Sequence, residues 1–323
     1  MFEVEKKGVL VEWTGTPVPD GAVPDGAAPD GVVPDRFVPD GPVPDGAAPD
    51  GVVPDRLALD GPAGEARGHV IICPGGGYQW HSPREAKPVA CAFAARGWKP
   101  WVLYYPVAGR EDERSCAGTQ SPLEEIRGPL HEIPLGTAPL LSAADAMRRV
   151  RAAAAGKPVI LCGFSAGAHV AASLGVHWKD GGLFSAEDQA AVRPDALILG
   201  YPVITAGEYA HRESIEMLAG DGPAEYFSLE NFVDEQTPPA FIWHTAADST
   251  VSVQNSLLFA GALANRQVPF ELHIYPYGEH GLSLATKEVE EPEKKRYADA
   301  HVAGWFGQCA EWLEEMIGGK QEE

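Results

Sequence analysis

One pentapeptide constrains the fold of this chain more than any other segment. The apolar run PVILC (158–162) is followed by GFSAG (163–167) and then by the apolar run AHVAASLGV. A buried strand, a turn with small residues around a serine, and a helix therefore follow one another. That order is typical of the strained turn that raises a serine hydroxyl above the end of a parallel sheet. Ser165 is the candidate nucleophile.

Short apolar runs alternate with helical patterns along the rest of the chain. The spacing predicts strands over 69–73, 100–105, 158–162, 196–200, 240–244 and 270–275, and helices over 83–96, 140–155, from 166, 252–266 and 298–317. This alternation indicates βαβ units and a mostly parallel central sheet with helices on both faces, which is the α/β class. The segment 109–136 has no clean period, and we expect an irregular excursion over the carboxyl ends of the strands.

The N-terminal part differs in composition from the rest. From Pro17 to about Gly61 a five-residue unit of the VPDGA type repeats, and VPDGAAPDGVVPDR occurs twice. Pro-Asp-Gly favours turns, but the Val and Ala residues between them cannot bury enough surface to offset chain entropy. We therefore expect N-terminal strands within 1–16, a disordered or turn-rich insert over 17–61, and a catalytic domain over 62–323. The evenly spaced Asp residues lack the dense ligand pattern of a calcium loop.

Charge and composition narrow the class of partner. The formal charge of -21 would repel nucleic acid and polyanionic substrates, so a neutral small molecule fits better. No signal peptide and no run of roughly 18 apolar residues is evident, and we expect a cytoplasmic protein without a membrane partner. The five cysteines form no CxxC pair, which disfavours a disulfide or zinc framework. We expect no cofactor and no metal, and the oligomeric state stays open.

Two further residues fall where a serine nucleophile needs them. A serine hydroxyl requires a base that a carboxylate orients, and on this kind of sheet the order is Ser, Asp, His. Asp248 lies in TAADSTV just after the strand predicted over 240–244, and His280 lies in YGEHGLS just after 270–275. Loops at the carboxyl ends of parallel strands are where ligands bind. We predict that Ser165, His280 and Asp248 form a catalytic triad.

The glycine run in CPGGGY (73–78) fits the same chemistry. An acyl-transfer enzyme needs backbone amides that stabilise a developing oxyanion, and the usual donors are the residue after the nucleophile and the loop after an early strand. We predict that the amides of Gly76, Gly77 and Ala166 form this oxyanion hole. A plain tight turn is the alternative for the glycines, whereas a phosphate loop is disfavoured because no Lys-Ser/Thr follows.

Several aromatic and histidine side chains near these loops are candidates for contacting the substrate. Aromatic faces could stack on a sugar ring, and loop histidines could bind sugar hydroxyls, although packing in the core or at the rim is an equal alternative. The candidate substrate-binding residues are Tyr78, Trp80, His81, Tyr201 and His211. We expect His169, four residues after the nucleophile on its helix, to have a structural role.

Taken together, these segments resemble the α/β-hydrolase fold esterases that act on acylated carbohydrates, the acetylesterase and acetylxylan-esterase-like family. The resemblance covers residues 69 to about 285 and is carried by CPGGGY with SPREAKPVA, GFSAGAH, GYPVIT with HRESIEMLAG, and TPPAFIWHTAADSTVSVQNS with FELHIYPYGEHGLSLA. It implies a serine esterase that removes short acyl groups, acetyl in the first place, from a carbohydrate or another small neutral ester. A peptidase of the same fold and a non-catalytic binding protein are the alternatives.

Overall fold

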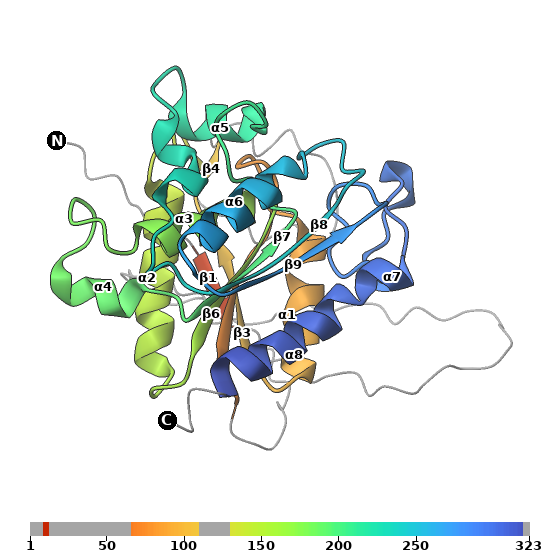
Figure 1. The fold of residues 1–323 in the computed structure, drawn as a ribbon, viewed down its shortest axis with the longest axis horizontal. Coiled ribbons are helices and arrows are strands. Elements are labelled where there is room, and N and C mark those ends of the chain that lie inside the picture. The colour runs from red at the N-terminus through yellow and green to blue at the C-terminus, as the bar shows by residue number, and fades with distance from the viewer. Residues whose placement is uncertain (1–8, 13–65, 110–129, 319–323) are drawn as a thin grey trace, which may run out of the picture.

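A seven-stranded sheet runs through the described part of the protein (Figure 1). The computed structural model describes residues 9–12, 66–109 and 130–318. The insert predicted over 17–61 and most of the excursion predicted over 109–136 lie outside these residues. The strand order is β1-β3-β2-β6-β7-β8-β9, in which β1 is antiparallel to β3 and the other neighbouring pairs are parallel.

The strands and helices have the following bounds. The strands of the large sheet are β1 (Val9–Glu12), β2 (His69–Cys73), β3 (Lys99–Tyr104), β6 (Val159–Phe164), β7 (Ala196–Gly200), β8 (Ala240–Thr245) and β9 (Phe270–Tyr275). A small parallel pair is formed by β4 (Val107–Ala108) and β5 (Leu130–His131). The helices are α1 (Lys87–Ala95), α2 (Ala138–Ala153), α3 (Ala166–His177), α4 (Ala186–Val192), α5 (Arg212–Ala219), α6 (Gln254–Asn265), α7 (Ala300–Ala303) and α8 (Trp305–Gly318).

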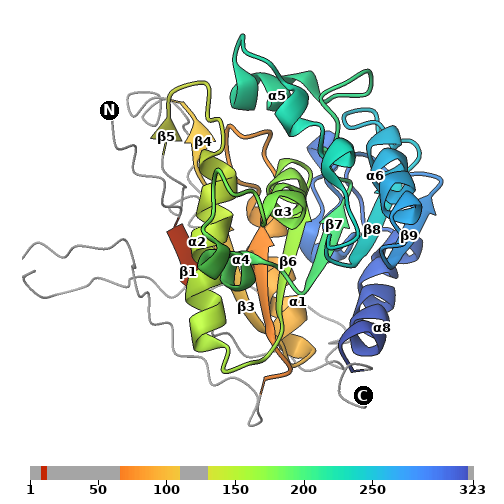
Figure 2. The same ribbon diagram turned by 60° about the vertical axis from the view of Figure 1, so that its left-hand side comes forward.

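Both faces of the sheet are buried, as the sequence predicts. On β6, Leu161 faces the core layer under α2, α3 and α6, while Ile160 and Cys162 face the layer under α1 and α8. Figures 1 and 2 show these two sets of helices on opposite sides of the sheet. Because alternate side chains of a strand point to opposite faces, a strand buried on both sides is apolar throughout.

Two predicted helices are each divided in the structure. The helix predicted over 83–96 begins as a 3-10 turn, Pro83–Glu85, and continues as α1 only after a break at Ala86. Pro88 has no amide hydrogen and its ring would clash with the carbonyl four residues earlier, so the turn cannot continue directly into α1. The helix predicted over 298–317 is divided into α7 and α8 at Gly304, a residue that favours helix ends.

Helix α5 lies at the same end of the molecule as the small β4–β5 pair (Figure 2). The amides of Leu135 and Gly136 donate hydrogen bonds of 2.9 Å each to the carbonyls of Met217 and Leu218 near the end of α5. The short elements α4, α5, β4 and β5 are not among the helices and strands predicted from the spacing. Among the described segments, no helix combines the length and apolar character needed to cross a bilayer.

Candidate active site

Ser165 occupies the tight turn between β6 and α3. Its backbone has φ 53° and ψ -120°, a conformation that side-chain-bearing residues rarely adopt. Both glycines of the motif are required because neighbouring backbone atoms leave no room for a side chain. A Cβ on Gly163 would lie 2.3 Å from the Gly167 carbonyl oxygen, and a Cβ on Gly167 would lie 2.0 Å from the Cys73 carbonyl oxygen. The turn therefore closes only with small neighbours, and it places the serine at the carboxyl end of the sheet.

The structure brings the three predicted triad residues together. His280 Nε2 lies 2.9 Å from Ser165 Oγ, and His280 Nδ1 lies 2.6 Å from Asp248 Oδ2. A carboxylate can only accept, so Nδ1 carries the hydrogen and Nε2 is free to accept the serine proton. These three side chains follow β6, β8 and β9, which lie next to or near one another in the sheet.

Asp248 is held by several hydrogen-bond donors. Its Oδ1 accepts from the amides of Thr250 and Val251, each at 2.9 Å. His244 Nε2 lies 3.3 Å from its Oδ2. Burial by itself would raise the pKa of this carboxyl, but the hydrogen bonds from His244 and His280 outweigh burial and leave the pKa well below its usual value. The carboxylate is therefore charged and fixed in direction.

The glycine loop lines the same cavity as Ser165 and His280. Gly76 has φ 139°, and a Cβ there would lie 2.0 Å from the Trp80 carbonyl oxygen, whereas Gly77 has φ 62° and no atom closer than 3.8 Å to its Cβ position. Among the described residues, neither glycine amide has a hydrogen-bond acceptor. Ala166 is buried and begins α3 directly after the nucleophile. These are the three positions predicted for an oxyanion hole.

A cavity of about 170 Å³ opens at Ser165 and His280 and is also lined by Gly76 and Gly77. Two of the predicted substrate-binding residues line it, Trp80 and His211. Trp80 is 49% exposed. Burial, followed by the nearby His280, lowers the pKa of His211. The cavity is also lined by polar side chains that the sequence analysis did not single out, namely Gln79, Ser82, Glu85, Glu213, Thr250 and Arg296.

The remaining three predicted substrate-binding residues do not line this cavity. Tyr78 is buried, and its hydroxyl lies 2.7 Å from His169 Nδ1. Tyr201 is buried behind the site, with its ring centroid 5.0 Å from that of His280. His81 packs edge-on against Tyr105, and burial lowers the pKa of its imidazole to about 3. Of these three side chains, Tyr201 contacts the site from behind, whereas Tyr78 and His81 pack against other residues.

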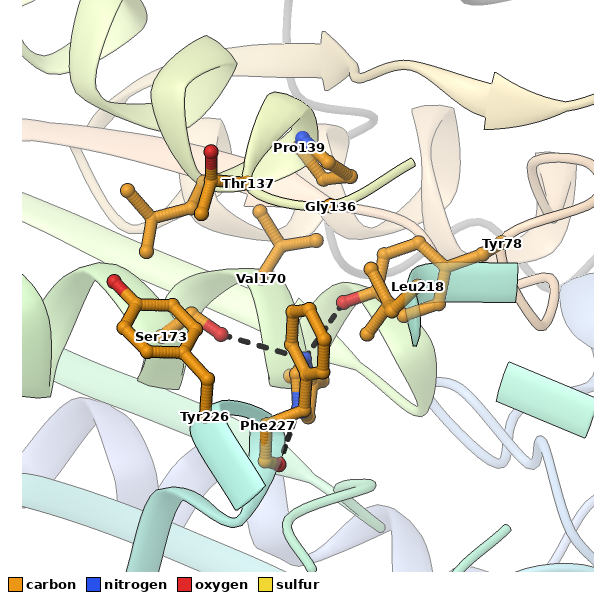
Figure 3. A pocket seen from close by; sticks show the side chains of 11 residues that line it. Tyr78, Gly136, Thr137, Pro139, Val170, Ser173, Leu218, Tyr226 and Phe227 are labelled. Carbon is orange, nitrogen blue, oxygen red and sulfur yellow. Dashed lines mark hydrogen bonds between the residues drawn. The ribbon is translucent and has the colours of Figure 1, made fainter. Parts of the chain in front are cut away.

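His169 lies on α3 in a buried polar network, and Figure 3 shows three of the residues around it, Tyr78, Ser173 and Phe227, at the wall of a pocket. Its Nε2 lies 3.0 Å from the carbonyl oxygen of Phe227, while Nδ1 lies 2.7 Å from the Tyr78 hydroxyl and 3.3 Å from Ser173 Oγ. Burial lowers the pKa of His169 to about 4, so the ring is neutral at neutral pH. The adjoining cavity of about 10 Å³ has room for roughly one water molecule. This arrangement fits the expected structural role.

Glu85 is a buried residue of the site that the sequence analysis missed. Its Oε2 accepts from the amide of Gly75 at 2.7 Å, and its Oε1 accepts from the hydroxyl of Tyr201 at 2.7 Å. A glutamate inside the segment SPREAKPVA, directly before an apolar helix, was the available signal. Among the described residues, no group of three or more His, Cys, Asp or Glu side chains is arranged to hold a metal ion.

Comparison with known proteins identifies the family. The model of the prolyl oligopeptidase family matches residues 140–312, more than half of the chain, and this range includes Ser165, Asp248 and His280. The chain is a member of the prolyl oligopeptidase family. Among solved structures, this family member is similar to an acetyl ester-xyloside bifunctional hydrolase from Caldicellulosiruptor lactoaceticus, with 34% identity, a TM-score of 0.61, and coverage of 79% of this chain and 85% of that chain.

Two curated relatives are also similar over part of their length. The family member is 38% identical over 229 residues to endo-1,4-beta-xylanase B of Butyrivibrio fibrisolvens, which is 68% of this chain and 33% of that protein. It is 33% identical over 135 residues to an acetylxylan esterase of Xylanibacter ruminicola, which is 39% of this chain and 26% of that protein. The chain therefore spans about a third and about a quarter of these relatives.

These relatives bear on three of the predictions. The α/β-hydrolase fold is confirmed by the structural neighbours, which also include a carboxylesterase from Lactobacillus plantarum at 28% identity and a TM-score of 0.61. The resemblance to esterases of this fold is confirmed as well. The prediction of a carboxylic ester hydrolase agrees with these neighbours and is argued below as a proposal. The roles of individual site residues and the choice of substrate are treated below as proposals.

Proposed function

We propose that this protein is a serine esterase that removes short acyl groups, acetyl in the first place, from carbohydrates or other small neutral esters. The observation that carries the proposal is the hydrogen-bonded series from Ser165 through His280 to Asp248, at 2.9 Å and 2.6 Å, on the wall of an open cavity. The tautomer that this geometry requires is the one in which His280 Nε2 can accept the serine proton.

The reaction proceeds in two halves through an acyl-enzyme. Ser165 Oγ attacks the ester carbonyl while His280 Nε2 takes its proton, and the charge of Asp248 stabilises the imidazolium that forms. His280 then donates this proton to the leaving alcohol oxygen. In the second half a water molecule attacks the acyl carbonyl, with His280 again as base, and the acid and free Ser165 are released.

The amides of Gly76, Gly77 and Ala166 stabilise the tetrahedral intermediate in this proposal. Preorganised donors directed at a developing oxyanion are commonly worth about 10²–10³ in kcat each. The two glycine amides have no acceptor among the described residues, and both glycines line the cavity that contains Ser165. Unused donors at the reacting centre are what an oxyanion hole requires.

The size and lining of the cavity support a short acyl group on a polar alcohol. A cavity of about 170 Å³ is small compared with ligand sites of roughly 300–1,000 Å³, which suits a small ester better than a long-chain lipid. Trp80 is half exposed and offers an aromatic surface, although Lys294 Nζ lies over its ring at 5.7 Å from the centroid. Gln79, His211 and Thr250 offer groups that can bind hydroxyls. We therefore propose Trp80 and His211 as substrate contacts.

The relatives favour a carbohydrate ester over a peptide. The xylanase, the acetylxylan esterase and the bifunctional hydrolase are similar to this chain over longer stretches than the dipeptidyl peptidase family member 1 of Caenorhabditis elegans, which matches over 91 residues, or 27% of the chain. The charge of -21 disfavours an anionic substrate and nucleic acid. A peptidase of the same fold is the rival that the experiment must separate.

A substrate series tests the proposal. We expect kcat/KM to fall from acetyl to butyryl to octanoyl esters of one chromogenic alcohol, and acetate to be released from acetylated xylo-oligosaccharides. Ser165→Ala, with its fold checked by circular dichroism, should be inactive on all of them. Preference for octanoyl esters without acetate release would indicate a lipase-like enzyme instead. Cleavage of a chromogenic dipeptide amide faster than of the acetyl ester would indicate a peptidase.

A further inference from the structure

His244 lies behind the carboxylate of Asp248 and is fully buried near the end of β8. Its Nε2 is 3.0 Å from the carbonyl oxygen of Val251 and 3.3 Å from Asp248 Oδ2, and its Nδ1 is 2.8 Å from Ser256 Oγ. A carbonyl oxygen can only accept, so Nε2 carries a hydrogen. In the neutral ring Nδ1 then accepts from the hydroxyl of Ser256.

This histidine completes the set of donors around the carboxylate. Oδ1 of Asp248 accepts from the amides of Thr250 and Val251, and Oδ2 lies within 2.6 Å of His280 Nδ1. An ionised carboxylate offers about four acceptor sites. His244 Nε2, whose one hydrogen is shared with the Val251 carbonyl oxygen at 3.0 Å, lies 3.3 Å from Oδ2 as a fourth and longer contact, so both carboxylate oxygens are approached on two sides.

His244, on β8, also connects the loop that carries Asp248 to the sheet and to helix α6. Through Val251 it reaches the turn that begins at Asp248, and through Ser256 it reaches α6. Rotation of its ring is opposed at both nitrogens. The direction of its Nε2 hydrogen is therefore set by three separate elements, which is what a group needs if it is to hold another side chain in one orientation.

We propose that His244 is a positioning residue of the active site, whose Nε2 hydrogen keeps Asp248 Oδ2 directed at His280 Nδ1. The proposal rests on the serine esterase function above, because it concerns the base of that reaction. Without this contact, Asp248 Oδ2 keeps only His280 as a hydrogen-bond partner and turns from it more often, and the imidazole then spends less time with Nε2 directed at Ser165. The consequence is a lower kcat, while the cavity that binds the ester is unchanged.

A pair of amide substitutions separates this role from simple packing. His244→Gln places a donor close to the position of Nε2, whereas His244→Asn is one methylene shorter and can contact Ser256 but not Asp248. We expect kcat on the acetyl ester to fall about tenfold to a hundredfold in His244→Asn, as for loss of a hydrogen bond to a charged group, with KM within about threefold. His244→Gln should recover most of that loss.

One NMR measurement and one control variant test whether His244 acts through the hydrogen bond between Asp248 and His280. The far-downfield proton resonance of His280 Nδ1 should weaken or move in His244→Asn and return in His244→Gln. Ile242→Val, which removes a buried methyl group from the same strand without touching the carboxylate, should lower stability in urea and leave kcat and this resonance unchanged.

The possible failures are distinguishable. If Ser165→Ala turns over the ester at the wild-type rate, the esterase proposal is wrong, and the proposal for His244, which depends on it, is wrong as well. If Ser165 is required but His244→Asn keeps the wild-type kcat, or if both His244 variants lose kcat equally with the His280 resonance unmoved, the positioning role is overturned and the esterase stands.

Discussion

The hydroxyl of Tyr201 donates a 2.7 Å hydrogen bond to Glu85 Oε1 although 116 residues separate the two in the chain. The other oxygen of Glu85 accepts from the amide of Gly75, next to the predicted oxyanion glycines. The Tyr201 hydroxyl in turn accepts from the amide of Ser283, three residues after His280. One buried carboxylate thus connects the glycine loop to the loop that carries the base.

Glu85→Gln should weaken this connection. An amide group has only one acceptor oxygen, so either the Gly75 amide or the Tyr201 hydroxyl loses its partner, at a cost of about 1–3 kcal/mol for a buried polar group. We expect kcat to fall about tenfold or more, with a smaller change in KM, in steady-state measurements. Glu279→Gln, an exposed carboxylate beside His280 in the sequence, removes the same charge and should leave kcat unchanged.

The two glycines of the predicted oxyanion hole should respond differently to alanine. A Cβ on Gly76 would lie 2.0 Å from the Trp80 carbonyl oxygen, so Gly76→Ala must move the loop and should lower kcat roughly a hundredfold. Gly77→Ala meets no close atom and carries only the left-handed backbone cost of about 1–2 kcal/mol, so its loss should be much smaller. Equal losses in kcat from both variants would contradict the explanation that a Cβ clashes at Gly76 but not at Gly77.

The sequence predicted the positions of Ser165, Asp248 and His280 because each depends on local information. A strand, a glycine-flanked serine and a helix fix one position, and the ends of two later strands fix the others. The structure brings these three together. Assigning them from spacing required no knowledge of side-chain packing.

Side-chain direction could not be predicted in the same way. Tyr78 and Tyr201 follow the glycine loop and β7 directly, and both have positive φ, 63° and 36°, which turns their side chains into the core instead of the cavity. Glu85 joins the site through Tyr201, 116 residues away, and Arg296 joins it through a hydrogen bond to the carbonyl oxygen of His280. The strands β4 and β5 contain two residues each, too few for any period to be read.

Two further glycines allow a matched test of packing against helix propensity. Gly167→Ala would put a Cβ 2.0 Å from the Cys73 carbonyl oxygen, so α3 could not remain against β2, and we expect a loss of stability of about 1–3 kcal/mol or more. Gly261 lies in α6 with no atom within 4 Å of its Cβ position, so Gly261→Ala should gain about 0.5–1 kcal/mol. Urea unfolding at constant pH measures both changes.

The depressed pKa of Asp248 predicts how its contribution to stability depends on pH. Because the folded-state pKa lies below the ordinary value of 3.8, the charged carboxylate stabilises the fold fully above that pH, and this stabilisation is lost as the pH falls through the folded-state pKa. Asp248→Asn lacks this contribution, and it should also lower kcat by about 10⁴, the size seen when a triad aspartate is replaced in a serine protease. The difference in unfolding free energy between wild type and Asp248→Asn, measured in urea from neutral pH downward, should therefore stay constant above 3.8 and narrow below it. Ser165→Ala retains the carboxylate and should follow the wild-type pH dependence; a gap for Asp248→Asn that widens on acidification would contradict the assignment of these hydrogen bonds as stabilising the charged form.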